Sequence, residues 1–114
     1  MRKLVGALII TVFLPSLAFA ASWEKVALID TMCAQKEKVK GNPDGHPTSC
    51  LLKCADNGYG IQASDGKFIK LDAEGNKLAV AELKKTAKKD HIRVDVNGEQ
   101  KGDVIAVSSL KIAD

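Results

Sequence analysis

The feature that most constrains this chain is a series of short apolar segments of strand type, with one longer helical pattern among them. In these segments β-branched residues form runs or alternate with polar residues, as they do in strands. Five segments have this character: 23–32, 59–63, 67–71, 91–97 and 104–112. Strands this short and this numerous predict a single small β-rich domain.

Two turns fix the strand pairs that we expect. Ser64-Asp65-Gly66 is a strong hairpin signal between the second and third segments. The last two segments could turn at Asn97-Gly98 or at Lys101-Gly102. We favour the second position, with Gly98 as a β-bulge.

Two helices are predicted between the strands. A short one covers 47–55, with Pro47 at its start and a left-handed stop at Asn57-Gly58. A longer one covers 76–89, where apolar residues recur at helical spacing. The segment 41–47 holds two prolines and two glycines, so we expect a loop there.

Five short strands with a helix between the third and fourth match the small, partly open barrel of the OB type. The predicted fold class is therefore α+β, a five-stranded OB-like barrel with one short and one longer helix. We expect residues 21–114 to form this one domain.

The first twenty residues have the three parts of a secretory signal peptide. Arg2 and Lys3 provide the positive start, and an apolar run covers 4–14. Ala18-Phe19-Ala20 offers a small-x-small cleavage pattern. We expect residues 1–20 to be removed and the protein to be exported, to the periplasm or beyond the cell. The apolar run is much shorter than the roughly 20 residues of a membrane span, which disfavours an uncleaved anchor.

The basic charge of the chain depends on this leader. The full chain has 17 basic and 14 acidic residues, and removing Arg2 and Lys3 leaves 15 basic residues, a net charge of +1. Strong electrostatic binding of nucleic acid is therefore not expected. One basic cluster lies on the last turns of the longer predicted helix, and we interpret it as a solvated helix end. Its members are Lys84, Lys85, Lys88 and Lys89.

Three cysteines and one histidine carry the distinctive chemistry: Cys33, His46, Cys50 and Cys54. Cys50 and Cys54 are four residues apart, so they share one face of the short predicted helix. Three thiolates and an imidazole are a known ligand set for structural zinc, and the same soft donors suit copper(I). One hypothesis is therefore a single zinc or copper ion held by all four side chains.

A disulfide is the other hypothesis, and an oxidising compartment favours it. Cys50 and Cys54 are poor partners while both are helical, because a disulfide needs β-carbons about 3.8 Å apart. Cys33 bonded to Cys50 or to Cys54 is the expected bridge. The odd number of cysteines then leaves one free thiol.

Short motifs spread over the predicted mature chain support the same fold. They are Met-Cys at 32–33, His-x3-Cys-x3-Cys-Ala at 46–55, Gly-Tyr-Gly at 58–60 and Asp-Gly-Lys-Phe-x-Lys-Leu-Asp at 65–72. With the tail Val-x-Val, Lys-Gly-Asp and Val-Ser-Ser-Leu, this set resembles a group of small exported bacterial proteins of unassigned function. The resemblance implies an OB-like barrel and supplies no activity.

We expect a binding or structural role and no enzymatic activity. Cysteine catalysis needs a thiolate and an oriented base. Cys50 or Cys54 could pair with His46 or His91, but the sequence identifies no orienting Asn or Asp. A thiol redox role or a cysteine-dependent enzyme is therefore the lesser alternative. The expected partner is a metal ion, or an envelope protein bound by a disulfide-stabilised module.

Overall fold

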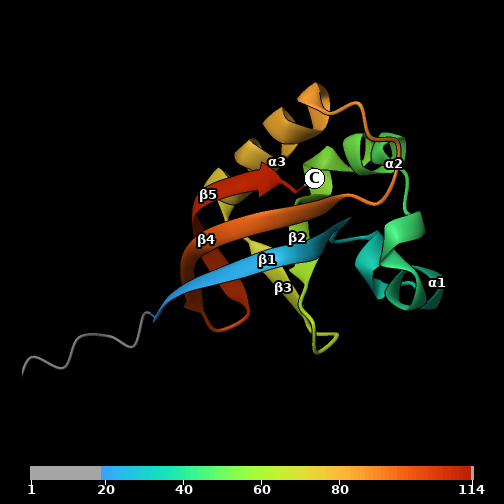
Figure 1. Ribbon diagram of the computed structural model, residues 1–114. Coiled ribbons are helices and arrows are strands. Elements are labelled where there is room, and N and C mark those ends of the chain that lie inside the picture. The colour runs from blue at the N-terminus through green and yellow to red at the C-terminus, as the bar shows by residue number, and fades with distance from the viewer. Residues whose placement is uncertain (1–18, 114) are drawn as a thin grey trace, which may run out of the picture.

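The computed structural model describes residues 19–113, whose strands form a closed barrel (Figure 1). The strands are β1 (Phe19–Asp30), β2 (Tyr59–Gln62), β3 (Phe68–Leu71), β4 (Arg93–Lys101) and β5 (Val104–Ile112). Their order around the barrel is β1-β2-β3-β5-β4, and β4 closes it by pairing with β1. The β3–β5 pair is parallel and the others are antiparallel. The predicted α+β, five-stranded OB-like barrel is confirmed, and it is closed where a partly open one was expected.

The predicted signal peptide lies mostly outside the described residues, because residues 1–18 are not among them. The expected cleavage point after Ala20 falls inside β1, where Phe19 and Ala20 pair with Gln100 and Glu99. Cleavage after Ala20 would remove only these two pairs, because the strand from Ala21 onward makes the other pairs with β4 and all the pairs with β2. Among residues 19–113, no helix is long and apolar enough to cross a membrane.

Glycine positions set the two hairpins as the sequence predicted. The β2–β3 turn contains Gly66 at φ +85°, and the β4–β5 turn contains Gly102 at φ +64°, a region that favours glycine. The β4–β5 register shifts between Asn97 and Gly98, which confirms the predicted bulge. A β-carbon on Gly98 would clash with the Ala106 carbonyl oxygen, so the bulge requires glycine.

The helix α3 (Ala73–Lys85) begins three residues before the predicted start and ends four residues before the predicted end. Asp72 caps its N-terminus by accepting a hydrogen bond from the Gly75 N–H at 2.9 Å, a start signal that the apolar pattern did not contain. Lys88 and Lys89 therefore lie beyond the helix, which corrects their placement on its last turns. Lys88 Nζ instead donates to the carbonyl oxygen of Ala113 at 2.8 Å.

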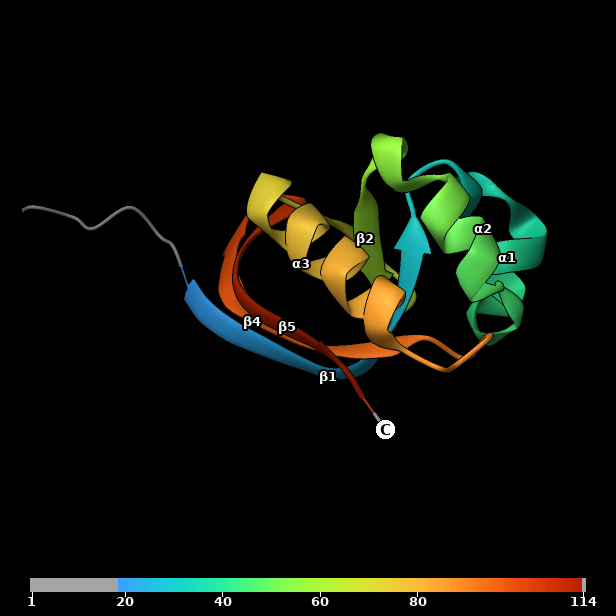
Figure 2. The same ribbon diagram turned by 90° about the horizontal axis from the view of Figure 1, so that it is seen from above.

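The segment between β1 and β2 is more helical than expected. It holds 3₁₀ turns at Cys33–Gln35, Pro43–Gly45 and Ala55–Asn57, and the helices α1 (Glu37–Gly41) and α2 (Thr48–Lys53). The short predicted helix corresponds to α2, and the predicted loop contains the second of these turns. Figure 2 shows α1 and α2 gathered at one end of the barrel, where β1 finishes.

The second half of the strand β1, from Val26 to Asp30, is buried on both faces. Val26 and Leu28 belong to the barrel core, while Ala27 and Ile29 pack on a second apolar cluster outside it. That second cluster is made by Cys33, Ala34 and Val39, with Phe68 against it. Because the segment after β1 covers the outer face of this strand, the end of β1 is shielded from water. A polar residue at that end must therefore find partners within the protein.

Candidate metal centre

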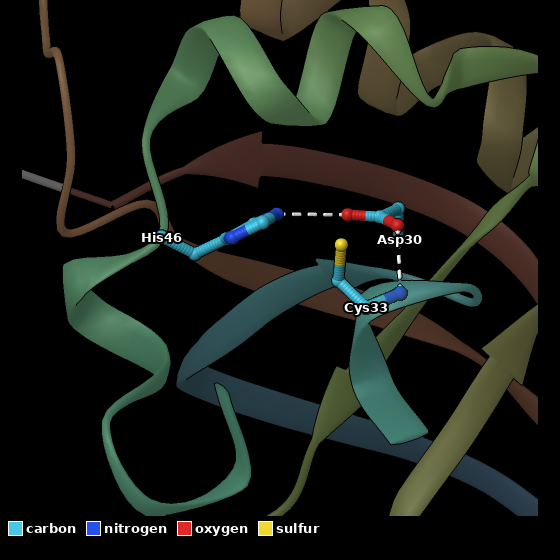
Figure 3. A group of neighbouring side chains, drawn as sticks. All are labelled: Asp30, Cys33 and His46. Atoms are coloured by element: carbon cyan, nitrogen blue, oxygen red, sulfur yellow. Dashed lines mark hydrogen bonds and ion pairs between the residues drawn. The ribbon is translucent and has the colours of Figure 1, made fainter. Parts of the chain in front are cut away.

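Three side chains from separate turns of the chain converge beside the end of β1 (Figure 3). They are Asp30, the last residue of β1, Cys33 and His46. One carboxylate oxygen, the Cys33 Sγ and one His46 ring nitrogen all lie within 4.8 Å of one another. We call this group the Asp-Cys-His site. It unites three donor types that transition metals bind.

Asp30 is fully buried at 0% exposure, and both of its oxygens are engaged. Oδ2 accepts a hydrogen bond from the Cys33 backbone N–H at 2.9 Å, and Oδ1 lies 2.8 Å from His46 Nε2. Burial raises the pKa of Asp30, but the hydrogen bonds from Cys33 and His46 outweigh it and hold the pKa below 3.8. The site therefore contains an ionised, buried carboxylate.

His46 presents Nε2 to that carboxylate from the turn that follows Pro43–Gly45. Its side chain is 9% exposed. Because the Asp30 carboxylate is ionised and can only accept, we assign the proton of this hydrogen bond to Nε2. A metal ion would have to take the place of that proton.

Cys33 provides the sulfur, and its side chain is also buried. Figure 3 shows Sγ pointing toward the line between His46 and the Asp30 carboxylate. Burial raises the pKa of the Cys33 thiol to about 11, and the hydrogen bond and negative charge of Asp30 add to the effect. A thiol with this pKa is protonated at neutral pH and is a poor nucleophile. Because a metal ion binds the thiolate, an ion at this site would have to displace the thiol proton.

An ion pair holds the turn that carries His46 against the barrel. Arg93 on β4 donates from two nitrogens to the two oxygens of Asp44, each at 2.9 Å. The hydrogen bond from Arg93 lowers the pKa of Asp44, and the same pairing raises the pKa of Arg93. The His91 N–H donates to the Asp44 carbonyl oxygen at 2.8 Å. These contacts fix the residue two positions before His46.

A second set of contacts holds the chain on the other side of His46. Thr48, at the start of α2, donates from its N–H to the Lys89 carbonyl oxygen and from its hydroxyl to the Lys88 carbonyl oxygen, both at 2.8 Å. The linker between α3 and β4 therefore binds both flanks of His46. The imidazole is positioned before any ligand arrives, which lowers the cost of binding one.

Two of the four residues predicted as ligands, Cys33 and His46, meet in this site. Cys50 and Cys54 are half-buried and lie outside the three-residue group. Cys50 lines the same cavity as Cys33 and His46, whereas Cys54, which ends α2, is not among the residues of that cavity. All three cysteines are free thiols in this structure, so the proposed bridges from Cys33 stay predictions.

The other histidine is separate from the site. His91 is exposed, at φ +54°, and its Nδ1 lies 2.7 Å from Asp90. His91 therefore lies in an exposed position two residues before β4 begins.

Sequence reasoning missed Asp30. The available signal was its position, a single carboxylate directly after the apolar run 26–29 and three residues before Cys33. A strand end buried on both faces rarely keeps an acidic residue without a bound partner.

Comparison of the chain with protein-family models, with curated proteins and with solved structures found no match. The resemblance to small exported bacterial proteins therefore stays a prediction, and the function must be argued from the site itself.

Proposed function

We propose that this protein is an exported metal-binding domain that holds one zinc(II) ion through Asp30, Cys33 and His46. The carboxylate is a hard oxygen donor, which suits zinc better than copper(I), whereas the thiolate and imidazole suit both ions. The predicted leader supports export, and the role is binding rather than catalysis.

The observation that carries the proposal is the place of the Cys33 sulfur. A purely structural contact between Asp30 and His46 would need only their hydrogen bond of 2.8 Å. The sulfur adds a third donor within 4.8 Å of both, beside a carboxylate that is fully buried. A carboxylate, a thiol and an imidazole together form a ligand set of the kind that zinc uses.

The distances require little rearrangement. Zinc bonds of about 2.0–2.3 Å in a tetrahedron place ligand atoms about 3.5 Å apart. The oxygen–nitrogen pair, now 2.8 Å apart, would open by about 0.7 Å, and the sulfur already lies within 4.8 Å of both atoms.

Zinc binding would also neutralise the negative charge of the site. His46 would bind the ion through Nε2 as a neutral imidazole that carries its proton on Nδ1, and the Cys33 thiol would release its proton to solvent. One carboxylate and one thiolate then balance the two positive charges of zinc. The buried carboxylate, now matched only by hydrogen bonds, would gain a full counter-charge.

The test is zinc content and affinity in variants of single ligands. Purified protein with reduced thiols should bind about one zinc ion per chain by native mass spectrometry. Cys33→Ser and His46→Gln should each lower the affinity by at least about 100-fold, because even changes to groups behind the ligands cost about 10–100-fold. Cys54→Ser is the matched control and should bind zinc as the parent does.

Two results would count against the proposal. Parent protein that binds no zinc at stoichiometric concentration would remove the metal site altogether. Loss of zinc in Cys54→Ser would support the three-cysteine ligand set instead. The disulfide alternative is read from the same spectra, because a bridge from Cys33 lowers the intact mass by two hydrogens and blocks zinc.

A further inference from the structure

A cavity of about 430 Å³ opens directly onto two residues of the Asp-Cys-His site. Cys33 and His46 are part of its wall, and Cys50 lines it as well. The remaining polar side chains around it are those of Lys36, Lys38 and Asn42. Among the described residues, none of those lining this cavity is acidic. We call it the site cavity.

The two lysines that line the site cavity form no ion pair with a carboxylate among the described residues. In the described part of the chain, the ion pairs involve Lys40, His46, His91 and Arg93, and neither Lys36 nor Lys38 takes part in one. Lys36 is held next to Cys33 by its backbone N–H, which donates to the Cys33 carbonyl oxygen at 3.0 Å. Two lysines without an ion-pair partner among the described residues therefore line the same cavity as the Cys33 side of the site.

The number of ligands that zinc needs also points to the site cavity. A tetrahedral zinc ion with three protein ligands keeps one position open. Asp30 is at 0% exposure and does not line the cavity, whereas Cys33 and His46 do, so we expect the open position on the cavity side of the site. Cys50 is outside the group of converging donors, so it does not fill that position in this arrangement.

We propose that the fourth ligand is a small carboxylate anion that enters through the site cavity and is attracted by Lys36 and Lys38. This inference rests on the proposed function, because the anion binds to the metal. With Asp30 and Cys33 ionised, the zinc site is neutral, so an added anion gives it one negative charge. Two nearby ammonium groups stabilise that charge, and the Asn42 amide offers a hydrogen-bond donor beside it.

The experiment replaces zinc with cobalt(II), whose visible absorption reports its ligands, and titrates the loaded protein with acetate. Acetamide has the same size without the charge and serves as the control ligand. The double variant Lys36→Met, Lys38→Met tests the two cations. The matched control is Lys84→Met, Lys85→Met on the exposed end of α3, which changes the net charge equally.

We expect a saturable change of the cobalt spectrum with acetate and none with acetamide. The first double variant should bind acetate about tenfold more weakly, and the α3 variant should match the parent. A cobalt spectrum that acetate leaves unchanged, or an equal response in both double variants, would overturn the anion inference while the metal site stands. A response that appears only in Cys50→Ser would show that Cys50 fills the position. Failure of cobalt and zinc to bind at all would overturn both proposals.

Discussion

At the residue scale, Asp30 determines what the site can do. It is an ionised carboxylate at 0% exposure, and it is stabilised by hydrogen bonds from Cys33 and His46. Such a group is costly unless it is fully matched. The same residue therefore fixes the turn that starts at Cys33 and supplies the negative charge that would attract a cation.

The substitution Asp30→Asn tests both roles. An amide keeps the shape but loses the charge, so its hydrogen bonds to Cys33 and His46 weaken. We expect a loss of about 1.5–3 kcal/mol in the free energy of unfolding, measured by urea denaturation without metal. Zinc affinity should fall at the same time. Asp56→Asn, on an exposed carboxylate, should stay within about 0.5 kcal/mol of the parent. Equal stability of the two variants would contradict the structural role of Asp30.

Tyr59 gives an independent prediction of pH dependence. Its side chain is fully buried, and its hydroxyl donates to the Leu51 carbonyl oxygen at 2.7 Å. Burial raises the pKa of Tyr59 to about 12, and the charge of Asp30 adds to the effect. Because the folded pKa lies above the unfolded value of 10.0, this stabilisation is complete below pH 10 and is lost as the pH rises toward 12.

Urea midpoints measured between neutral pH and about pH 12 check this prediction. The parent should lose stability across the alkaline window, and Tyr59→Phe should lose less there while being less stable at neutral pH. A parallel decline of the two proteins would show that other groups cause the alkaline unfolding.

At the scale of elements, the turn that carries His46 depends on β4. Asp44 and Arg93 are 49 residues apart in the sequence and form a bidentate ion pair. Bidentate pairs of arginine with a carboxylate are stronger than pairs with a single hydrogen bond. Arg93 also donates to the Lys25 carbonyl oxygen at 2.8 Å, so it joins β1, β4 and the turn. This positions an imidazole that the local sequence alone would leave in a loop.

Arg93→Met should therefore weaken zinc binding although Arg93 touches no ligand atom. We expect a loss of about tenfold or more, the range found for groups that position metal ligands. Lys111→Met on β5 is the control, since this lysine is exposed and lies outside the contacts that hold the turn. Isothermal titration with zinc gives the comparison. Unchanged affinity in Arg93→Met would show that His46 is positioned without the ion pair.

Packing of α3 against β5 gives a prediction about two helical glycines. A β-carbon on Gly75 would lie 2.5 Å from Val107 Cγ2, whereas one on Gly41 would meet nothing within 4 Å. Gly75→Ala should lower the free energy of unfolding by about 1–3 kcal/mol through overpacking, despite the better helix propensity of alanine. Gly41→Ala should be neutral or slightly stabilising. Thermal and urea unfolding measure both, and a stable Gly75→Ala would mean that α3 can shift on the barrel.

At the scale of the whole molecule, local patterns were sufficient to predict the barrel. Alternation at Ile92, Val94 and Val96 and the glycines at 66, 98 and 102 define strands and turns through nearest neighbours, and the structure agrees. The start of α3 was missed because a single cap, Asp72, outweighs the apolar spacing.

The site was only half predictable, for a physical reason. Cys33 and His46 could be identified by residue type, but their third partner is a strand residue whose role exists only once the chain between β1 and β2 folds back over β1. That fold-back is held by contacts such as Asp44 with Arg93 and Thr48 with Lys89, which are long-range pairs with no local pattern. Sequence spacing favoured Cys50 and Cys54 because they are close along the helix.

The central claim is that zinc is bound by one sulfur together with oxygen and nitrogen donors. X-ray absorption at the zinc edge of the loaded protein tests it most directly. The account predicts one sulfur neighbour at about 2.3 Å and two or three oxygen or nitrogen neighbours at about 2.0 Å. A shell of three sulfurs with one nitrogen would contradict it and assign the ion to Cys33, Cys50, Cys54 and His46 instead.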